Sequence, residues 1–190
     1  MSFSTFLVYL RAFFPRIPDW HWIVIGVVSL ALTIYSLSHK KCSTYGAVAL
    51  GLAVFIGLYL LDALALNRVG MEGVREAGID LEAEWHRLLH GGRENRMQML
   101  FNVAAFTPLG FAMAEFWVSK GMDTWRCLGR MTLAAFGLSL CIECIQMFFS
   151  VGIFELTDLV LNTAGAVIGA GLSLVIHFLI QLSAKRKVYG

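Results

Sequence analysis

Apolar residues dominate five long stretches of the chain, and most charged residues fall between these stretches. Each stretch reaches the roughly 20 apolar residues that a helix needs to cross a hydrocarbon core of about 30 Å. In lipid the peptide groups must bond within a helix, because an open strand would leave them unpaired. The pattern predicts membrane-spanning helices over Trp20–Leu37, Tyr45–Leu66, Met97–Val118, Cys127–Phe149 and Leu156–Leu182.

Two further segments have the amphipathic pattern of helices that lie in the membrane interface. One is the N-terminal segment, and the other is a surface helix expected around Ile79–His90. The chain is therefore predicted to be an all-α, polytopic membrane helix bundle. Its expected organisation is an interfacial segment 1–19, two spans in 20–66, an amphipathic connection 67–96, a core of three spans in 97–182 and a basic tail 183–190.

The composition agrees with a membrane protein, since 58% of the 190 residues are hydrophobic against about 45–50% in soluble proteins. A net charge of +2 with scattered basic residues excludes nucleic acid as a partner. The expected partners are membrane lipids and other membrane proteins, and no cofactor is predicted. The four cysteines lie in or beside apolar stretches, without the spacing of a disulfide framework.

Six polar residues of four spans are predicted to lie in one leaflet. Because consecutive helices alternate in direction, residues early in the third and fifth spans lie level with residues late in the second and fourth. At 1.5 Å per residue, all six fall within about two helical turns of one membrane surface. An ionisable group placed at mid-membrane costs about 2.5–3.5 kcal/mol, so such groups normally face the interior of the bundle. We predict a polar pocket formed by Asp62, Asn102, Glu143, Gln146, Asp158 and Asn162.

The fifth span shows how such a pocket could be packed. Asp158, Asn162, Gly165 and Gly169 share one helical face, and the two glycines form a G-x-x-x-G that lets another helix approach closely. Thr157 is the expected N-cap beside Asp158. The alternative is that these polar groups only hold helices together by hydrogen bonds.

Three blocks in the C-terminal half carry a resemblance to a known family: NVAAFTPLGF from Asn102, SLCIECIQ from Ser139 and DLVLNTAGAVIG from Asp158. In order and spacing they resemble the signature blocks of the VanZ-like bacterial membrane proteins. The matching positions are Asn102, Phe106, Pro108, Leu109, Gly110, Glu143, Gln146, Asp158, Asn162, Thr163, Gly165 and Gly169.

The resemblance implies a fold and a pocket more than a reaction. The founding member of the family is associated with low-level resistance to the glycopeptide antibiotic teicoplanin, which implies a role in the cell envelope and a place in the bacterial inner membrane. Family members commonly carry an Arg between the second and third blocks, but MFFSVGIFELT has none. If that Arg binds an anionic group, this chain either takes the cation from Arg93 or Arg96 on the same face or has lost that task.

The predicted function is recognition of an envelope component, such as a lipid-linked or peptidoglycan-related molecule. Modification of that molecule stays open, with Glu143 and Asp158 as general acid–base candidates, because no nucleophile or phosphate-binding loop indicates a reaction. The rival prediction is a non-catalytic subunit or scaffold of a larger membrane complex. Proton-coupled transport is a third prediction, although five spans without repeats give little basis for alternating access.

The distribution of Lys and Arg sets the predicted orientation. The face that holds the C-terminus has the larger number of basic residues once Arg75 and Arg87, which neighbour acidic residues, are discounted. This bias favours a cytoplasmic C-terminus. The polar pocket would then open to the outer leaflet.

Several other residues could carry chemistry. Glu82, His86 and His90 recur at a spacing compatible with metal ligation, but a surface amphipathic helix explains the same pattern and is favoured over a metal site. Cys141 and Cys144 are interpreted as small packing residues rather than a redox pair.

Three residues of the spans stand apart from the pocket. Glu115 is expected to reach the membrane interface. His177 is expected to be hydrogen-bonded, with haem or pigment ligation as the alternative. Pro108 should kink the third span or free a backbone carbonyl.

Overall fold

The computed structural model describes residues 17–39, 43–66, 81–150 and 154–189, and over these residues the chain forms helices and no strands. The all-α fold class is confirmed. The predicted interfacial helix in residues 1–19 lies almost wholly outside the described residues. The helices are α2 (Asp19–Ser38), α3 (Thr44–Leu64), α4 (Leu81–His90), α5 (Arg93–Ser119), α6 (Thr124–Phe148) and α7 (Leu156–Tyr189).

Five of these helices, all except α4, are long and apolar enough to cross a membrane. Large apolar side chains cover their outer surfaces: Ile23 is 66% exposed, Leu133 72% and Val160 61%. Such a surface is stable where hydrocarbon, rather than water, contacts it. The protein is therefore a multi-pass membrane protein.

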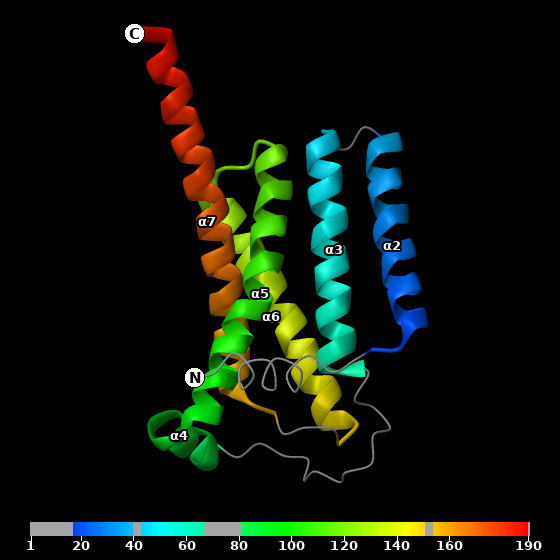
Figure 1. The fold of residues 1–190 in the computed structure, drawn as a ribbon, viewed down its shortest axis with the longest axis vertical. Coiled ribbons are helices and arrows are strands. Elements are labelled where there is room, and N and C mark those ends of the chain that lie inside the picture. The colour runs from blue at the N-terminus through cyan, green and yellow to red at the C-terminus, as the bar shows by residue number, and fades with distance from the viewer. Residues whose placement is uncertain (1–16, 40–42, 67–80, 151–153, 190) are drawn as a thin grey trace.

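The helices alternate in direction, so that the starts of α5 and α7 lie at the same end of the molecule as the ends of α3 and α6 (Figure 1). α5 packs against α3, α6 and α7, while α2 packs on the outer side of α3. The short helix α4 lies at the end where α5 begins (Figure 1). This arrangement gathers the polar ends of four spans on one face.

Large side chains fill the space between the spans. Phe106 and Leu109 of α5 are buried against Met131 and Ile142 of α6 and against Leu60 of α3. Between α2 and α3 the contact is aromatic, with the rings of Trp22 and Tyr59 stacked at 5.2 Å. α2 is the least buried span.

Helices α5 and α7 meet through three glycines, which we call the glycine seam. A side chain on any of them would collide with backbone of the facing helix, so the two helices approach more closely than larger residues would allow. The pairs are Gly110 with the carbonyl of Ala166, Gly165 with that of Val103, and Gly169 with that of Thr107.

Some boundaries differ from the sequence prediction. α5 begins at Arg93 rather than Met97, with Gly92 at its N-cap position. The first turn of the helix needs no apolar residues, so hydropathy does not detect it. α7 continues to Tyr189, so the predicted tail 183–190 is mostly helix. Pro108 lies inside α5 without ending it.

The glycine seam leads to a stability prediction. Gly169→Ala should lower the free energy of unfolding by about 1–3 kcal/mol, as overpacking does, because the added methyl meets the backbone of α5. Gly171→Ala is the matched control in the same helix, since open space surrounds Gly171. Thermal unfolding of the purified protein in detergent measures both. Equal stability of the two variants would contradict the seam.

Candidate functional site

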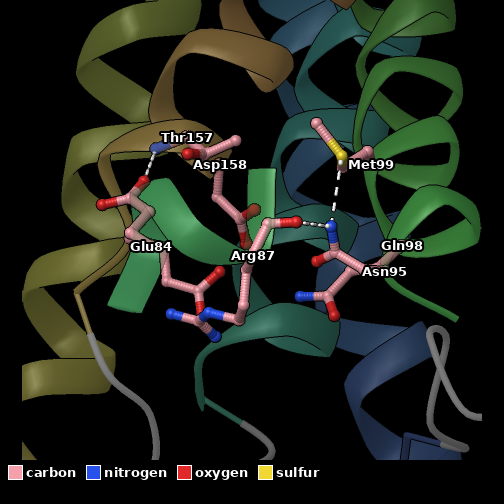
Figure 2. Close-up of a pocket in the computed structure, with 8 residues that line it drawn as sticks. Glu84, Arg87, Asn95, Gln98, Met99, Thr157 and Asp158 are labelled. Atoms are coloured by element: carbon pink, nitrogen blue, oxygen red, sulfur yellow. Dashed lines mark hydrogen bonds and ion pairs between the residues drawn. The ribbon is translucent and has the colours of Figure 1, made fainter. Parts of the chain in front are cut away.

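A small polar pocket lies between α4, the first turns of α5 and the start of α7 (Figure 2). Its free volume is about 10 Å³, room for about one water molecule. The lining residues are Glu84, Arg87, Asn95, Gln98, Met99, Glu155, Thr157 and Asp158. Half of the lining side chains are charged, which is rare so close to membrane-spanning segments.

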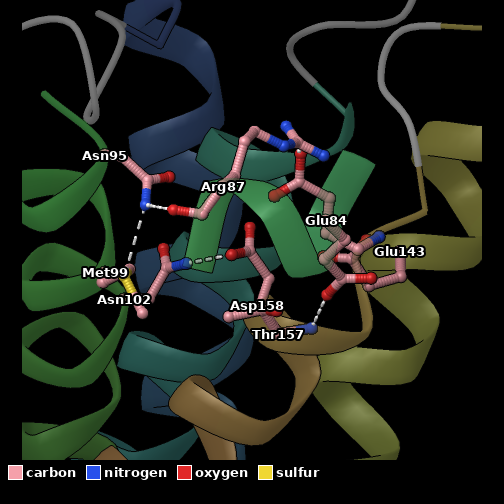
Figure 3. A network of polar contacts seen from close by, with 9 residues as sticks. Glu84, Arg87, Asn95, Met99, Asn102, Glu143, Thr157 and Asp158 are labelled. Carbon is pink, nitrogen blue, oxygen red and sulfur yellow. Dashed lines mark hydrogen bonds and ion pairs between the residues drawn. The ribbon is translucent and has the colours of Figure 1, made fainter. Parts of the chain in front are cut away.

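Asp158 is the predicted site residue that lines this pocket, and Asn102 positions it. The Asn102 Nδ2 donates to Asp158 Oδ1 at 2.6 Å (Figure 3). Asn102 is only 3% exposed, and the next residue, Val103, faces Gly165 across the glycine seam. The close approach of α5 and α7 therefore brings this amide onto the carboxylate.

The first turn of α7 is capped by carboxylates from other helices. Glu143 of α6, 2% exposed, accepts the Glu155 N–H at 2.9 Å, and Glu84 of α4 accepts the Thr157 N–H (Figure 3). The prediction of Thr157 as N-cap is wrong, because α7 already begins at Leu156. Negative groups at the N-terminus of a helix accept hydrogen bonds from its free N–H groups and interact favourably with the helix dipole.

Asn162 and Gln146 contact groups deeper in the bundle or on a neighbouring span. Asn162 Nδ2 donates to Ser139 Oγ of α6 at 2.9 Å, and its buried Oδ1 has no partner among the described residues. Gln146 Nε2 donates to the carbonyl of Leu64, at the end of α3, at 2.8 Å. Both amides thus link helices, and neither lines the pocket.

Asp62 forms a separate pair. Its Oδ2 lies 2.7 Å from His21 Nδ1 of α2, and it does not line the pocket. The structure therefore ties Asp62 to the outermost span. His21 was not predicted as a site residue, although its place near the start of the first span, level with Asp62, was a usable signal.

The pocket's cation is Arg87 of α4. Its Nη1 lies 2.7 Å from Glu155 Oε1, and both residues line the pocket. The expectation that Arg93 or Arg96 supplies the cation is wrong, because both are exposed and neither lines the pocket. In the sequence, acidic residues neighbour Arg87, so its charge looks balanced locally. Nothing in the sequence indicates its contact with Glu155, which lies 68 positions further along the chain.

The surface helix α4 does not bring a metal-ligand set together among the described residues. The rings of His86 and His90 lie 5.0 Å apart, while Glu82 is exposed. Trp85 and Leu89 are 62% and 57% exposed, as expected of side chains that contact lipid. The face of α4 turned toward the bundle carries Glu84 and Arg87 instead.

A second polar cluster lies at the opposite end of the spans. Glu115 is 4% exposed and accepts hydrogen bonds from Tyr45 of α3 and, at 2.8 Å, from Ser173 of α7. His177 Nε2 lies 2.8 Å from the same carboxylate. The expectation that Glu115 reaches the membrane interface is wrong, because three groups of two other helices hold it inside the bundle.

These features define a class of protein: a polytopic helical membrane protein with a polar site at one end of its spans. A family model described as VanZ/LLP1 matches residues 47–177. The chain belongs to the VanZ/LLP1 family, and the match extends the resemblance seen in the C-terminal half to include most of α3. No match is found among curated proteins or among solved structures.

The Asn102–Asp158 contact should be measurable as a coupling energy. Asn102→Ala and Asp158→Ala should each destabilise the protein, but the double variant should lose about 1–3 kcal/mol less than their sum, because the hydrogen bond is lost only once. Unfolding of the four proteins in detergent gives the value. The distant pair of Asn102 and Asp123 serves as control and should be additive; additivity for Asn102 and Asp158 would contradict the contact.

The Glu115 cluster gives a graded prediction. Glu115→Ala should cost about 3–5 kcal/mol, as breaking a buried pair does, since it removes the shared acceptor of Tyr45, Ser173 and His177. Tyr45→Phe should cost only about 0.5–1.5 kcal/mol, because it removes one hydrogen bond. Chemical unfolding of both variants ranks them. Equal costs would mean that Glu115 is not the centre of the cluster.

Proposed function

We propose that the protein binds a bacterial cell-envelope component at its polar pocket, through the polar head of a lipid-linked or peptidoglycan-related molecule. Family membership supports an envelope role, through the resistance associated with the founding member. The position of the pocket supports a lipid-linked ligand, because the site lies at the ends of membrane-spanning helices. A head group at the surface could reach it while the lipid chain stays in the membrane.

One observation carries the proposal: Asp158 lies in a membrane-spanning helix, is held by Asn102, and still lines a pocket. Ionisable groups in such segments are costly, and they are retained mainly where they act on ions or substrates. A carboxylate held in one orientation by a buried amide is preorganised for a ligand.

The charges of the pocket favour a particular kind of head group. Glu84, Glu155 and Asp158 line it, against the single lining cation Arg87, which already contacts Glu155. Hydrogen-bond acceptors in the lining therefore outnumber charged donors. Sugar hydroxyls, amides or amines fit this lining better than a bare phosphate does, because they donate hydrogen bonds to carboxylates.

The proposal includes an orientation. The C-terminus lies in the cytoplasm of a bacterium and the pocket opens to the outer leaflet of its inner membrane. The basic residues Lys120, Arg126 and Arg130 lie at the end of the spans opposite the pocket, in agreement with the positive-inside rule. If the ligand is also modified, Asp158 is the group that would transfer protons, because Glu143 caps the start of α7 and does not line the pocket.

A scaffold in a larger membrane complex is the competing function. It is favoured by the mutual pairing of the polar groups, since Asn162 bonds Ser139 and Gln146 bonds a backbone carbonyl, as interhelical hydrogen bonds would in any bundle. Transport through the carboxylates has less support. Between Asn162 and Ser173, the α7 residues that the structure shows against the α5 backbone are small and apolar: Gly165, Ala166 and Gly169.

The test compares ligand binding in near-isosteric variants. Asp158→Asn should insert and fold, but should lose a co-purifying envelope molecule at least about tenfold, because a charge-assisted contact to the head group is gone. Native mass spectrometry of protein released from lipid nanodiscs measures the bound molecule. Glu115→Gln is the matched control and should retain the ligand. Glu115 is a buried carboxylate between the same two helices, α5 and α7, but it lies outside the pocket.

The same variants separate the two functions. A scaffold tolerates Asp158→Asn with normal assembly and bound molecules, and that outcome would contradict the binding proposal. If the envelope component bound by the pocket bears on teicoplanin action, expression of the protein in cells should raise tolerance to that antibiotic. Asp158→Asn should abolish the increase. Unchanged tolerance in both strains would remove resistance from the proposal.

A further inference from the structure

The pocket is too small for the ligand proposed above. Its free volume of about 10 Å³ holds about one water molecule, whereas ligand sites usually have several hundred cubic ångströms. A head group can enter only if one wall moves. The inference that follows rests on the proposed function, because it describes how that same pocket opens.

Two of the three walls are fixed to each other. α5 and α7 meet backbone to backbone at the glycine seam, and Asn102 joins them again at the level of the pocket. Separating them would break this packing along the length of both helices. The α5 and α7 walls are therefore expected to move as one body.

The third wall, α4, is attached through its described side chains by polar contacts at the pocket itself. Glu84 accepts the Thr157 N–H, and Asn95 Nδ2 donates to the Arg87 carbonyl at 2.9 Å (Figure 3). Arg87 also pairs with Glu155. The two large apolar side chains of α4 that the structure describes, Trp85 and Leu89, are exposed and do not anchor it. Partly exposed ion pairs such as that of Arg87, whose side chain is 41% exposed, stabilise only weakly.

A glycine pair connects α4 to the fixed walls. α4 ends at His90 and α5 begins at Arg93, with only Gly91 and Gly92 between them. A side chain at Gly91 would collide with the Arg87 carbonyl and with Asn95, so glycine is required for the closed position. Without side chains, both residues can also adopt the backbone angles of another position.

We propose that α4 is a hinged gate over the pocket, turning about Gly91 and Gly92, with the Arg87–Glu155 ion pair as its latch. In the closed state Glu84 and Arg87 form the outer wall, drawn above Asp158 in Figure 3. In the open state the latch is broken and Asp158 is accessible from the membrane surface. Arg87 and Glu84 then become available to the ligand as it enters.

The experiment measures access to the pocket without any ligand. Met99, on the α5 wall, is changed to Cys in the full chain with its four native cysteines replaced, in lipid nanodiscs. A water-soluble maleimide then labels the introduced thiol at a rate that follows the open population when the gate moves faster than the reagent reacts. Glu155→Gln and Arg87→Gln should each raise this rate about two- to fivefold, the range for losing a partly exposed ion pair.

Two further variants make the result specific. Arg126→Gln breaks the ion pair with Asp123, 3.2 Å apart at the other end of the molecule, and should leave the rate unchanged. The charge swap Arg87→Glu with Glu155→Arg restores a pair and should return the rate toward that of the parent. A general loosening of the fold would raise the rate in the swap as well.

Two outcomes would overturn the gate: unchanged labelling in both single variants, or a swap that stays as fast as they are. Neither outcome depends on the ligand. If Asp158→Asn loses the ligand but labelling is the same with and without the Arg87–Glu155 pair, the proposed function stands and the gate is refuted. If labelling depends on the Arg87–Glu155 pair but Asp158→Asn keeps the ligand, the gate stands and the proposed function is refuted.

Discussion

The close approach of α5 and α7 is the constraint on which the rest of the structure depends. Lipid gives helices no hydrophobic reason to associate, so packing and interhelical hydrogen bonds must hold them. The glycine seam provides the packing, because no side chain separates Gly165 and Gly169 from the α5 backbone. At one end the seam brings Asn102 onto Asp158, and at the other it brings Glu115 to Ser173 and His177.

Over the residues that the structure describes, the bundle therefore has two polar layers with a mainly apolar core between them. Buried carboxylates in each layer are satisfied by donors from other helices, as hydrocarbon surroundings require. The layers differ in one respect that bears on function. The Glu115 carboxylate is enclosed by three partners, whereas Asp158 lines a pocket beside the amphipathic helix α4. A closed cluster holds helices together, and a carboxylate that lines a pocket can also meet a ligand.

Much of this was predictable from the sequence, and the failures have physical causes. Hydropathy alone predicts the five spans, and helix alternation predicts which polar residues share a depth. Depth does not give rotation about each helix axis, which is why Asp62 was grouped with Asp158 although it faces His21. The contribution of α4 was missed for another reason: Glu84 and Arg87 resemble any solvated charges of a surface helix until its docking on α7 is known.

The most direct measurement of the central claim is a cross-link formed in native membranes. Asn102→Cys and Asp158→Cys, in a chain without its other cysteines, should join through a short thiol-specific cross-linker, because the side chains that they replace lie within hydrogen-bond distance. A cysteine in place of the lipid-facing Val160, which is 61% exposed, should not join to the thiol that replaces Asn102. Cross-linking of the Val160 position but not of the Asp158 position would show that α7 is rotated away from α5, and the polar site would not exist.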